Sequence, residues 1–337
     1  MDRPVAHDFT LIVPTLNEEG PIVRLLESVA SQTLLPSEVL IVDGGSSDKT
    51  VAVASECCER LGIRFRVLDN PQRRVPNALN IGLQQTGTKY VGKVSAHSAL
   101  SDRYVEVIMS HLEAGRDGAG AKKSARGTTP QGRANAAVFN SRIGVGGSAY
   151  HYATTVRDAP HIPSGNYSTE LLKRIGGWDE NLPVSQDVEL DTRIVRNGGR
   201  LVLDPSAETY WSCRETLRGL FLQYRRYGCG VASVSLQDRS AFHSRHVLPI
   251  GLVLSHSALF AAGFSPKLRR PAGSLGLVYP SLLFSLGTVL SVRKRLNPLR
   301  VISALAAMQI GYGIGQIEAL MGRSPAPSQM RSHDTSS

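Results

Sequence analysis

Residues 9–112 repeat one unit, an apolar strand followed by a polar turn and a helix, and this repeat limits the fold more than any other feature of the sequence. Strands are expected at residues 9–13, 38–42, 64–68 and 90–94. The helix that starts at Pro21 places four apolar residues on one face, Ile22, Leu25, Leu26 and Val29. Strands that alternate with helices are typical of an α/β domain with a mostly parallel sheet.

The regular pattern weakens after this region and then returns. Residues 115–163 are rich in Gly, Ala and Ser, so we expect mobile or substrate-dependent loops there. A helix at residues 169–175, the turn at 176–180 and a helix at 185–197 follow. A short strand at 200–203 and a basic amphipathic helix at 215–227 complete this part of the chain.

Charged residues become sparse after Val247, where three apolar segments follow one another at residues 247–264, 274–292 and 301–321. Each is about long enough to cross a hydrocarbon core of roughly 30 Å as a helix. The alternative is a set of buried core helices, since the first and third segments contain polar residues. Basic groups at 267–270 and 293–300 would both favour the cytoplasmic side, yet consecutive spans would separate them. Either one segment is interfacial or re-entrant, or the positive-inside rule fails locally.

Charge and cysteine content exclude several classes of protein. The net charge of +10 is spread along the chain, and two basic groups flank apolar segments, which favours lipid headgroups over nucleic acid as the partner. The four cysteines show neither zinc spacing nor a disulfide framework. The apolar run at 9–13 is too short for a signal peptide, so the N-terminal domain is expected in the cytoplasm.

Polar turns follow the first, second and fourth predicted strands, at residues 14–18, 43–48 and 95–97. Ligands of open α/β sheets bind at the carboxyl ends of the strands, so these turns should converge on one crevice. Asp43 can accept hydrogen bonds from a nucleobase or ribose, while Gly44 and Gly45 permit close backbone approach. The alternative for this turn is an ordinary Asp-Gly turn with a helix cap.

The motifs taken together are far more specific. Leu11-Ile-Val-Pro-Thr-Leu-Asn-Glu18, Val39-Leu-Ile-Val-Asp-Gly-Gly-Ser-Ser-Asp-Lys-Thr50, Asn70-Pro-Gln-Arg-Arg-Val-Pro-Asn-Ala-Leu-Asn80, and Gly176-Gly-Trp-Asp-Glu180 with Gln186-Asp187 resemble family 2 glycosyltransferases of the GT-A fold. The resemblance covers about residues 8–230 and is greatest to the succinoglycan-type exopolysaccharide branch, which carries C-terminal membrane helices. It implies a catalytic domain at 1–230, a basic connector at 231–246, membrane-associated helices within 247–321 and a disordered tail at 322–337.

The resemblance also implies which residues bind the nucleotide sugar. These are Pro14, Thr15, Asn17, Glu18, Asp43, Gly44, Ser46, Asp48, Arg73 and Ser95, with Asp43 against the base.

Residues 93–97 stand where the family has its metal-binding Asp-x-Asp motif, which implies a divalent cation, Mg or Mn. Such a cation bridges the diphosphate and needs oxygen ligands. Here Ser95 replaces the first Asp, and a hydroxyl is a weaker ligand than a carboxylate, whereas His97 remains. Three alternatives follow: His97, the diphosphate and water hold the metal; Arg225 and Arg226 take up the leaving-group charge instead; or activity has been lost.

Asp187 matches the Asp of the family's Glu-Asp pair and is the candidate general base. In an inverting transfer, a carboxylate takes the proton from the acceptor hydroxyl as its oxygen attacks the anomeric carbon. The alternative is an aspartate favoured by the helix dipole. Gln223, Arg225 and Arg226 fall where processive relatives have Gln-x-x-Arg-Trp, and are assigned to the acceptor or the diphosphate.

Tyr227 replaces the tryptophan of that motif, which favours transfer of a single sugar over processive polymerisation. The two arginines could instead rest on lipid headgroups.

These features predict a glycosyltransferase that moves a sugar, with inversion, from a nucleoside diphosphate sugar to a lipid-linked glycan or polyisoprenyl phosphate. The resemblance implies exopolysaccharide or cell-envelope synthesis at the inner membrane, alongside other polysaccharide-assembly proteins. Two other classes remain open: a membrane scaffold that has lost turnover through Ser95, and a soluble nucleotidyltransferase with a similar N-terminal pattern. The soluble alternative explains neither Asp187 nor the apolar segments.

Overall fold

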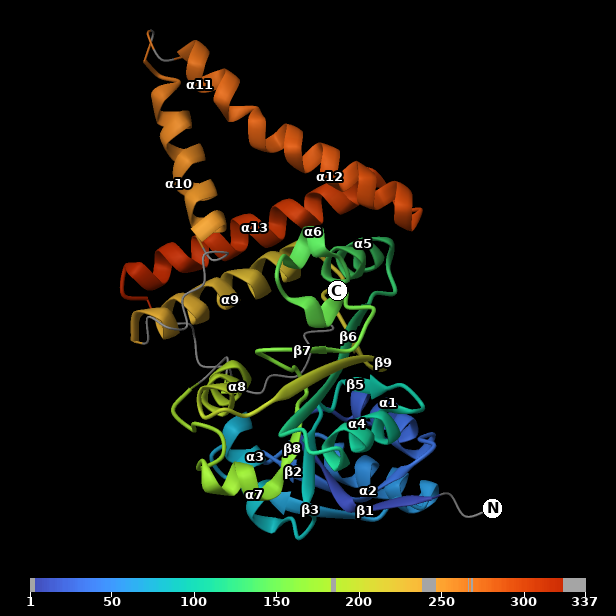
Figure 1. The fold of residues 1–337 in the computed structure, drawn as a ribbon. Helices are drawn as coiled ribbons and strands as arrows, with labels where there is room; N and C mark the ends of the chain where they lie inside the picture. Colours follow the sequence, from blue (N-terminus) through green and yellow to red (C-terminus); the bar gives the residue numbers. More distant parts are fainter. Residues whose placement is uncertain (1–3, 183–185, 238–246, 266, 268, 324–337) are drawn as a thin grey trace. The chain divides into compact units, whose positions relative to one another are not determined.

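The computed structural model describes residues 4–182, 186–237, 247–265, 267 and 269–323, and its chain divides into two units (Figure 1). The first unit consists of the described residues of Met1–Ser124 and Tyr152–Trp211. The second consists of those of Ala125–His151 and Ser212–Ala326. These boundaries differ from the expected domain at 1–230, because residues 125–151 group with the C-terminal helices.

Four parallel strands form one half of the sheet, in the order β3 (Phe65–Asp69), β2 (Leu35–Asp43), β1 (Val5–Thr15) and β4 (Tyr90–Lys93). Pairing is parallel throughout this half, with Thr15 opposite Asp43 and Asp43 opposite Asp69. All four strands lie where the apolar runs predicted them. The carboxyl ends of the strands therefore reach one edge of the sheet together.

The other half of the sheet contains the antiparallel pairs. The order continues from β4 through β8 (Asn166–Ser168), β6 (Gly118–Arg126) and β9 (Leu201–Ser212) to β5 (Ser98–Leu100), and β7 (Arg157–Asp158) pairs with β9. β8 is antiparallel to both β4 and β6, and β5 is antiparallel to β9. The expected α/β class is confirmed, with a mixed sheet that is parallel where the polar turns lie.

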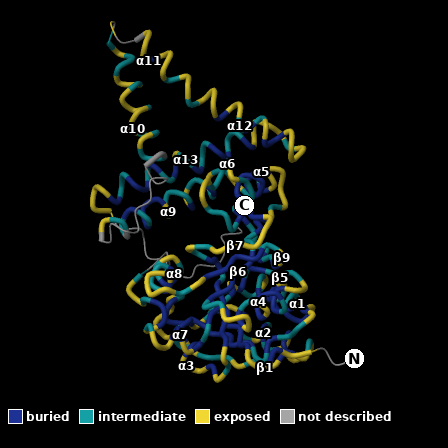
Figure 2. The backbone as a smooth tube through the Cα atoms, in the orientation of Figure 1, coloured by how far each residue is buried: buried dark blue, intermediate teal, exposed yellow. Residues whose placement is uncertain are grey.

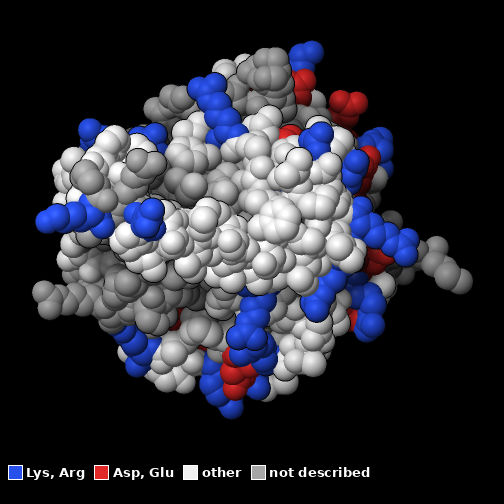
Figure 3. Space-filling view, turned by 90° about the horizontal axis from the view of Figure 1, so that it is seen from above, with Lys and Arg blue, Asp and Glu red and all other residues white. Residues whose placement is uncertain are grey.

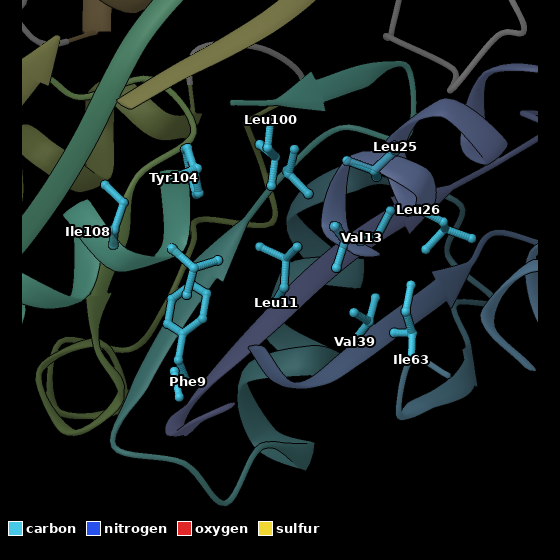
Figure 4. Close-up of a cluster of buried hydrophobic side chains, with 14 of the residues drawn as sticks. Phe9, Leu11, Val13, Leu25, Leu26, Val39, Ile63, Leu100, Tyr104 and Ile108 are labelled. Atoms are coloured by element: carbon cyan, nitrogen blue, oxygen red, sulfur yellow. The ribbon is translucent and has the colours of Figure 1, made fainter. Parts of the chain in front are cut away.

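Helices cover both faces of the parallel half. On one face, Phe9, Leu11 and Val13 of β1 pack in the main core with residues of α1 (Pro21–Ala30) and α4 (Tyr104–Glu113), as Figure 4 shows. The same core includes part of α2 (Thr50–Leu61). On the other face, α3 (Val75–Gln85) brings Gly82 so close to Ile12 that a Cβ would lie 2.7 Å from that side chain. Each leucine side chain buried in the main core contributes about 1.5–3 kcal/mol to the stability of the fold.

The region expected to be loops, residues 115–163, is largely structured. It contains β6, α5 (Pro130–Phe139), the short helix α6 (Arg142–Val145), a 3-10 turn (Ala149–His151) and β7. The pattern is weak because neighbouring side chains leave room only for small residues: a Cβ on Gly118 would lie 2.6 Å from Leu201, and one on Gly120 2.5 Å from Ile162. An interior strand built from small residues carries little hydrophobic signal.

The later elements of the first unit lie close to their predicted positions. They are α7 (Thr169–Arg174), α8 (Gln186–Arg196) and β9, which is longer than expected. The three residues before α8 lie outside the described ranges.

The second unit is built around α13 (Pro298–Leu320), which packs along α9 (Leu217–Gln237). Glycines make this packing close: a Cβ on Gly311 would lie 2.6 Å from the Phe221 carbonyl oxygen, and one on Gly315 1.9 Å from that of Arg225. Gly228 of α9 meets the Tyr312 carbonyl in the same way at 2.0 Å. Arg225 and Glu318 add a bidentate ion pair at 2.7 and 2.6 Å.

The second unit also contains α10 (Val247–Ala262), α11 (Arg269–Gly276) and α12 (Val278–Lys294), and most of the residues of these three helices are exposed or half-buried (Figure 2). One stretch among the described residues, Arg270–Lys294, is long and apolar enough to cross a membrane, and Pro249–Ala262 is a shorter apolar helix. The third expected segment, 301–321, lies in α13 and differs from the other two in burial, because nine residues of α13 are buried within the unit. Most of the expected connector, 238–246, and the tail from 324 lie outside the described residues.

Candidate active site

Two polar turns at the carboxyl edge of the sheet are joined by Asn17. Its backbone N–H donates to Ser46 Oγ at 2.9 Å, and its Oδ1 accepts from the Ser47 N–H at 2.8 Å. Asn17 has φ +55°, a left-handed conformation that asparagine tolerates better than most residues. Asn17 therefore holds the turn after β1 against the turn after β2, as the predicted convergence requires. Pro14 lies at the end of β1, opposite Val42.

Asp43 is buried and its carboxylate is fully engaged by its surroundings. Oδ2 accepts from the backbone N–H groups of Gly45 and Ser46 at 2.9 and 2.8 Å, and Oδ1 accepts from the hydroxyls of Ser46 and Thr15 at 2.6 and 3.2 Å. An ionised carboxylate offers about four acceptor positions. In this state Asp43 shapes its own turn, so contact with a base remains a prediction.

Arg73 closes over the same turn. Its Nε donates to the Gly44 carbonyl and its Nη2 to the Gly45 carbonyl, both at 2.7 Å. Gly45 needs its conformational freedom here because its φ is +74°. These bonds account for two of the five N–H donors of the guanidinium. Arg73 thus presents a fixed positive charge beside Gly44, whose backbone N–H donates to the Thr15 carbonyl at 2.8 Å.

Asp48 stands at the N-terminus of α2. Its Oδ1 accepts from the Thr50 N–H at 3.0 Å, and its Oδ2 accepts from the Glu19 N–H at 3.4 Å. Burial acts to raise the pKa of Asp48, but the hydrogen bonds from Thr50 and Glu19 outweigh it, and the pKa lies below its ordinary value. Asp48 therefore acts as a cap for this helix.

The third polar turn lies between β4 and β5. Ser95 is exposed and Ala96 is buried, while His97 points toward the first turn, with its Nδ1 3.4 Å from Glu18 Oε1. Both side chains are shielded, with 34% of His97 and 12% of Glu18 exposed. Within the described ranges, no group of three or more His, Cys, Asp or Glu side chains is arranged to hold a metal ion.

Asp187 lies in the first turn of α8 and forms an ion pair with Lys93, the last residue of β4. The partners are mostly buried, with 24% of the Asp187 side chain and 12% of the Lys93 side chain exposed. Burial acts to raise the pKa of Asp187, but the positive charges of Lys93, His161 and Lys123 outweigh it and hold that pKa below its ordinary value. The carboxylate is therefore ionised at neutral pH, and its partner Lys93 precedes Ser95 by two residues in the chain.

A second lysine, Lys123 of β6, adds positive charge near Asp187 and was not predicted from the sequence. Lys123 lies over the Trp211 ring, 5.4 Å from its centroid. Burial and the nearby charge of Lys93 lower the pKa of Lys123. Lys93 and Lys123 together give the surroundings of Asp187 a positive character that a diphosphate would complement.

A buried hydrogen-bond network lies one helical turn beyond Asp187. Asp191 is fully buried and accepts from His161 Nδ1 at 2.6 Å, from the Ile162 N–H at 2.8 Å and from the Tyr167 hydroxyl at 2.7 Å. Burial keeps the Tyr167 pKa well above its ordinary value, so this hydroxyl stays a donor. His161 was not among the residues that the sequence pattern singled out. The available signal was the spacing of Asp187 and Asp191, which puts both on one helix face.

Two motif stretches far apart in the sequence hold α8 in place. The Glu180 carboxylate accepts from Asn77 at 2.6 Å and from Asn80 at 2.9 Å, and Asn80 also exchanges hydrogen bonds with the Trp178 backbone. Arg193 of α8 donates to the carbonyls of Ile175 and Gly177 at 2.6 and 2.9 Å. The Gly-Gly-Trp-Asp-Glu turn therefore joins α3 to the helix that carries Asp187.

The residues assigned to the acceptor or diphosphate lie in the second unit, on α9. Gln223 is buried and donates to the Tyr227 hydroxyl at 3.0 Å, and Arg225 is bound by Glu318. Arg226 is exposed. Arg225 therefore has a structural partner of its own, and contact between these residues and the donor turns remains a prediction.

Comparison with known proteins identifies the family. The model of "Glycosyl transferase family 2" matches residues 10–145, which contain the turns after β1, β2 and β4. Succinoglycan biosynthesis protein ExoA of Rhizobium meliloti is 30% identical over 303 residues, 88% of this chain and 90% of that protein. The chain belongs to glycosyltransferase family 2. The chain is therefore a glycosyltransferase, and the predicted family is confirmed.

Other members of the family extend this comparison. The Methanococcus voltae dolichyl N-acetyl-alpha-D-glucosaminyl phosphate 3-beta-D-2,3-diacetamido-2,3-dideoxy-beta-D-glucuronosyltransferase is 22% identical over 265 residues, 75% of this chain and 81% of that enzyme. A solved structure of the mannosyltransferase PcManGT from Pyrobaculum calidifontis, in complex with GDP-Man and Mn2+, superposes with a TM-score of 0.65 at 20% identity. That match covers 96% of this chain and 89% of the other, and supports the GT-A fold.

Proposed function

We propose that this glycosyltransferase moves a sugar, with inversion at the anomeric carbon, from a nucleoside diphosphate sugar to a lipid-linked acceptor at a membrane surface. The product would serve exopolysaccharide or cell-envelope glycan synthesis. The observation that carries the proposal is the placement of Asp187 beside Lys93, at the sheet edge where the polar turns of the family motif meet.

The donor would be bound by the turns after β1, β2 and β4. Arg73 presents its charge and its remaining N–H groups, and Lys93 and Lys123 supply further positive charge. A diphosphate carries several negative charges, so a site with an excess of fixed cations favours it over a neutral ligand. One solved structure supports this donor class, since PcManGT is in complex with GDP-Man.

The transfer step can be written with the chain's own residues. Asp187 accepts the proton of the acceptor hydroxyl while that oxygen forms a bond to the anomeric carbon from the face opposite the nucleotide. The bond from the anomeric carbon to the diphosphate oxygen breaks, and its electron pair leaves with the diphosphate. Lys93 and Lys123 stabilise this developing charge. The low pKa of Asp187 keeps the base ionised before the acceptor arrives.

A divalent cation fits the chemistry of this site in part. When bound, it would supply positive charge to the diphosphate oxygens as the nucleotide leaves. His97 is a suitable ligand, and the Ser95 hydroxyl is a weak one. The presence of Mn2+ in the PcManGT structure supports use of such an ion by this fold.

Membrane attachment is supported by the second unit. Arg270–Lys294 would span about 38 Å as a helix, more than the roughly 30 Å hydrocarbon core. Figure 3 shows a broad face without charged side chains, bordered by Lys and Arg. Exposed apolar residues of these helices include Phe260, Phe264, Leu275, Leu277, Val278, Leu282, Phe284 and Val292. An acceptor carried on a lipid would then lie at the same surface, as the name of the Methanococcus relative suggests for that enzyme.

The test is a screen of nucleotide sugars against a lipid extract of the source membrane, with product mass measured. The wild-type chain should yield one glycosylated lipid, and Asp187→Asn should reduce kcat by about 10²- to 10⁴-fold while donor affinity persists. Asp158→Asn, an exposed aspartate paired with Arg116, is the matched control and should remain active. An Asp187→Asn enzyme of nearly normal rate would remove Asp187 as the base.

One observation favours a second candidate function. Ser95 stands where the family has a metal-binding aspartate, so a scaffold that binds the nucleotide sugar without turnover is the alternative. Donor binding without transfer or hydrolysis, for every donor and with the lipid extract present, would favour the scaffold.

A further inference from the structure

The replacement of aspartate by Ser95 leaves a family metal site without its first carboxylate, and a different carboxylate lies beside the remaining ligand. That carboxylate is Glu18, from the turn after β1. Its Oε1 lies 3.4 Å from His97 Nδ1. Ser95 itself is exposed.

The position of Glu18 is fixed by its backbone. Its N–H donates to Thr50 Oγ1 at 2.7 Å, and its carbonyl accepts from the Ile22 N–H at 3.0 Å as α1 begins. These bonds turn the side chain inward, where only 12% of it is exposed. The backbone hydrogen bonds of Glu18 therefore fix the residue beside His97.

One oxygen of this carboxylate is left unsatisfied. Glu18 Oε2 is buried and has no hydrogen-bond partner among the residues that the structure describes. A buried acceptor without a partner has given up its hydrogen bonds to water and receives none from the protein in return. Such an atom calls for a ligand, and a carboxylate oxygen is an acceptor that a hard divalent cation prefers.

We propose that Glu18 and His97 together hold the divalent cation of the donor complex, with Glu18 supplying the carboxylate that Ser95 lacks. This inference rests on the proposed function. Oε1 lies 3.4 Å from His97 Nδ1, so the two side chains are near enough to hold one ion jointly. The diphosphate oxygens and water would complete the coordination, which is why two protein ligands would suffice.

The adjacent glutamate, Glu19, has the same charge as Glu18 but a different position, and its carboxylate has a different partner. Glu19 Oε2 accepts from the Lys49 N–H at 3.2 Å, so this carboxylate serves the N-terminus of α2. Glu19→Gln is therefore a matched control for Glu18→Gln: it removes the same charge one residue away.

The experiment measures nucleotide affinity by calorimetry, with UDP and GDP, in EDTA and in Mn2+, and counts bound Mn2+ by electron paramagnetic resonance. In the wild type, Mn2+ should strengthen binding of one nucleotide. In Glu18→Gln, the Mn2+ effect should fall by at least about tenfold, a larger loss than any change in metal-free affinity. Glu19→Gln should behave as wild type. Ser95→Asp in the Glu18→Gln background should restore Mn2+ binding, because it returns the family's carboxylate.

The outcomes separate the two proposals. Loss of metal-free and Mn2+-dependent affinity in equal proportion would make Glu18 a nucleotide contact and overturn the metal role. An unchanged Mn2+ effect in Glu18→Gln would overturn it too, while the proposed function stands. A wild-type chain that binds neither nucleotide in either condition would refute the proposed function and the metal site with it. Metal-free affinity and circular dichroism also show whether each variant is folded.

Discussion

The close packing of α9 and α13 predicts that one glycine-to-alanine substitution separates the two helices, whereas a second substitution, outside this contact, has no such effect. In Gly315→Ala, the new Cβ would lie 1.9 Å from the Arg225 carbonyl oxygen and 2.8 Å from the Cys229 nitrogen, both backbone atoms of α9. An ordinary carbon–oxygen contact is about 3.3 Å or longer. The two helices must therefore separate locally, since both atoms belong to the backbone of α9.

The magnitude follows from two opposing effects. Overpacking of this kind costs about 1–3 kcal/mol, and the clash with two backbone atoms puts Gly315→Ala at the upper end. Alanine recovers at most about 1 kcal/mol through its greater helix propensity. The net loss is about 2 kcal/mol, or about a 30-fold rise in the population of the open form. Gly251→Ala in α10 lacks the clash, because its Cβ meets nothing within 4 Å.

Cys229 is the local reporter for this packing. Its thiol is 5% exposed and lies on α9 in a small core with Ala232 and Ala319. Alkylation of the full-length chain in detergent, followed by mass spectrometry of the peptide that contains Cys229, measures the opening of α9 from α13. Gly315→Ala should speed alkylation about 30-fold. Gly251→Ala should leave it unchanged. Equal rates for wild type and Gly315→Ala would refute the packing argument.

Three further predictions concern the first unit. In Lys93→Met, burial of Asp187 is opposed by less positive charge, so its pKa should rise and the acid limb of the pH profile of kcat/KM should move to higher pH; an unmoved limb would separate Lys93 from Asp187. Glu106 has its pKa lowered to about 2 by Arg103 and Thr33 from an ordinary 4.5, so its stabilisation is present above pH 4.5 and is lost as pH falls toward 2. Acid unfolding followed by tryptophan fluorescence should therefore show wild type and Glu106→Gln converging at low pH, and parallel curves would contradict this. Asp191→Asn should cost about 1.5–3 kcal/mol by weakening its buried hydrogen bonds, and the same fluorescence should show a Tm lower by roughly 2–4 °C per kcal/mol; an unchanged Tm would contradict it.

The strands of the parallel half could be predicted because their apolar runs are short and bounded by polar turns, and most residues of those runs in β1, β2 and β4 are buried. β6 could not be, since Gly118 and Gly120 are small for reasons that lie in Leu201 and Ile162, far away in the sequence. Local pattern carries no record of such long-range packing. The extent of α13 within the helical unit was missed for a related reason, because apolar residues buried by protein and by lipid look alike in sequence.

The candidate site likewise contains features that could be predicted from local sequence and features that could not. The polar turns were found because they follow strand ends, a local signal that places them at one sheet edge. The pairing of Lys93 with Asp187 and of His161 with Asp191 depends on how β8, α8 and β4 approach one another, which the sequence does not state. For Asp43, the residue type suggested a ligand contact, which stays a prediction. In the structure its oxygens accept hydrogen bonds from Thr15, Gly45 and Ser46.

The bonds between Asn80 and the turn at Trp178 and Glu180 have a consequence for the order in which the chain folds. Their partners are 98 to 100 residues apart, whereas β1, α1 and β2 pair within a few tens of residues. Distant contacts pay a larger loop-closure entropy and form later. The donor turns should therefore take shape first, and α8 should dock only after most of the unit exists. A nascent chain would then form the proposed donor-binding turns before α8 brings Asp187, the proposed base, into place, so that the groups proposed for transfer are assembled late in folding.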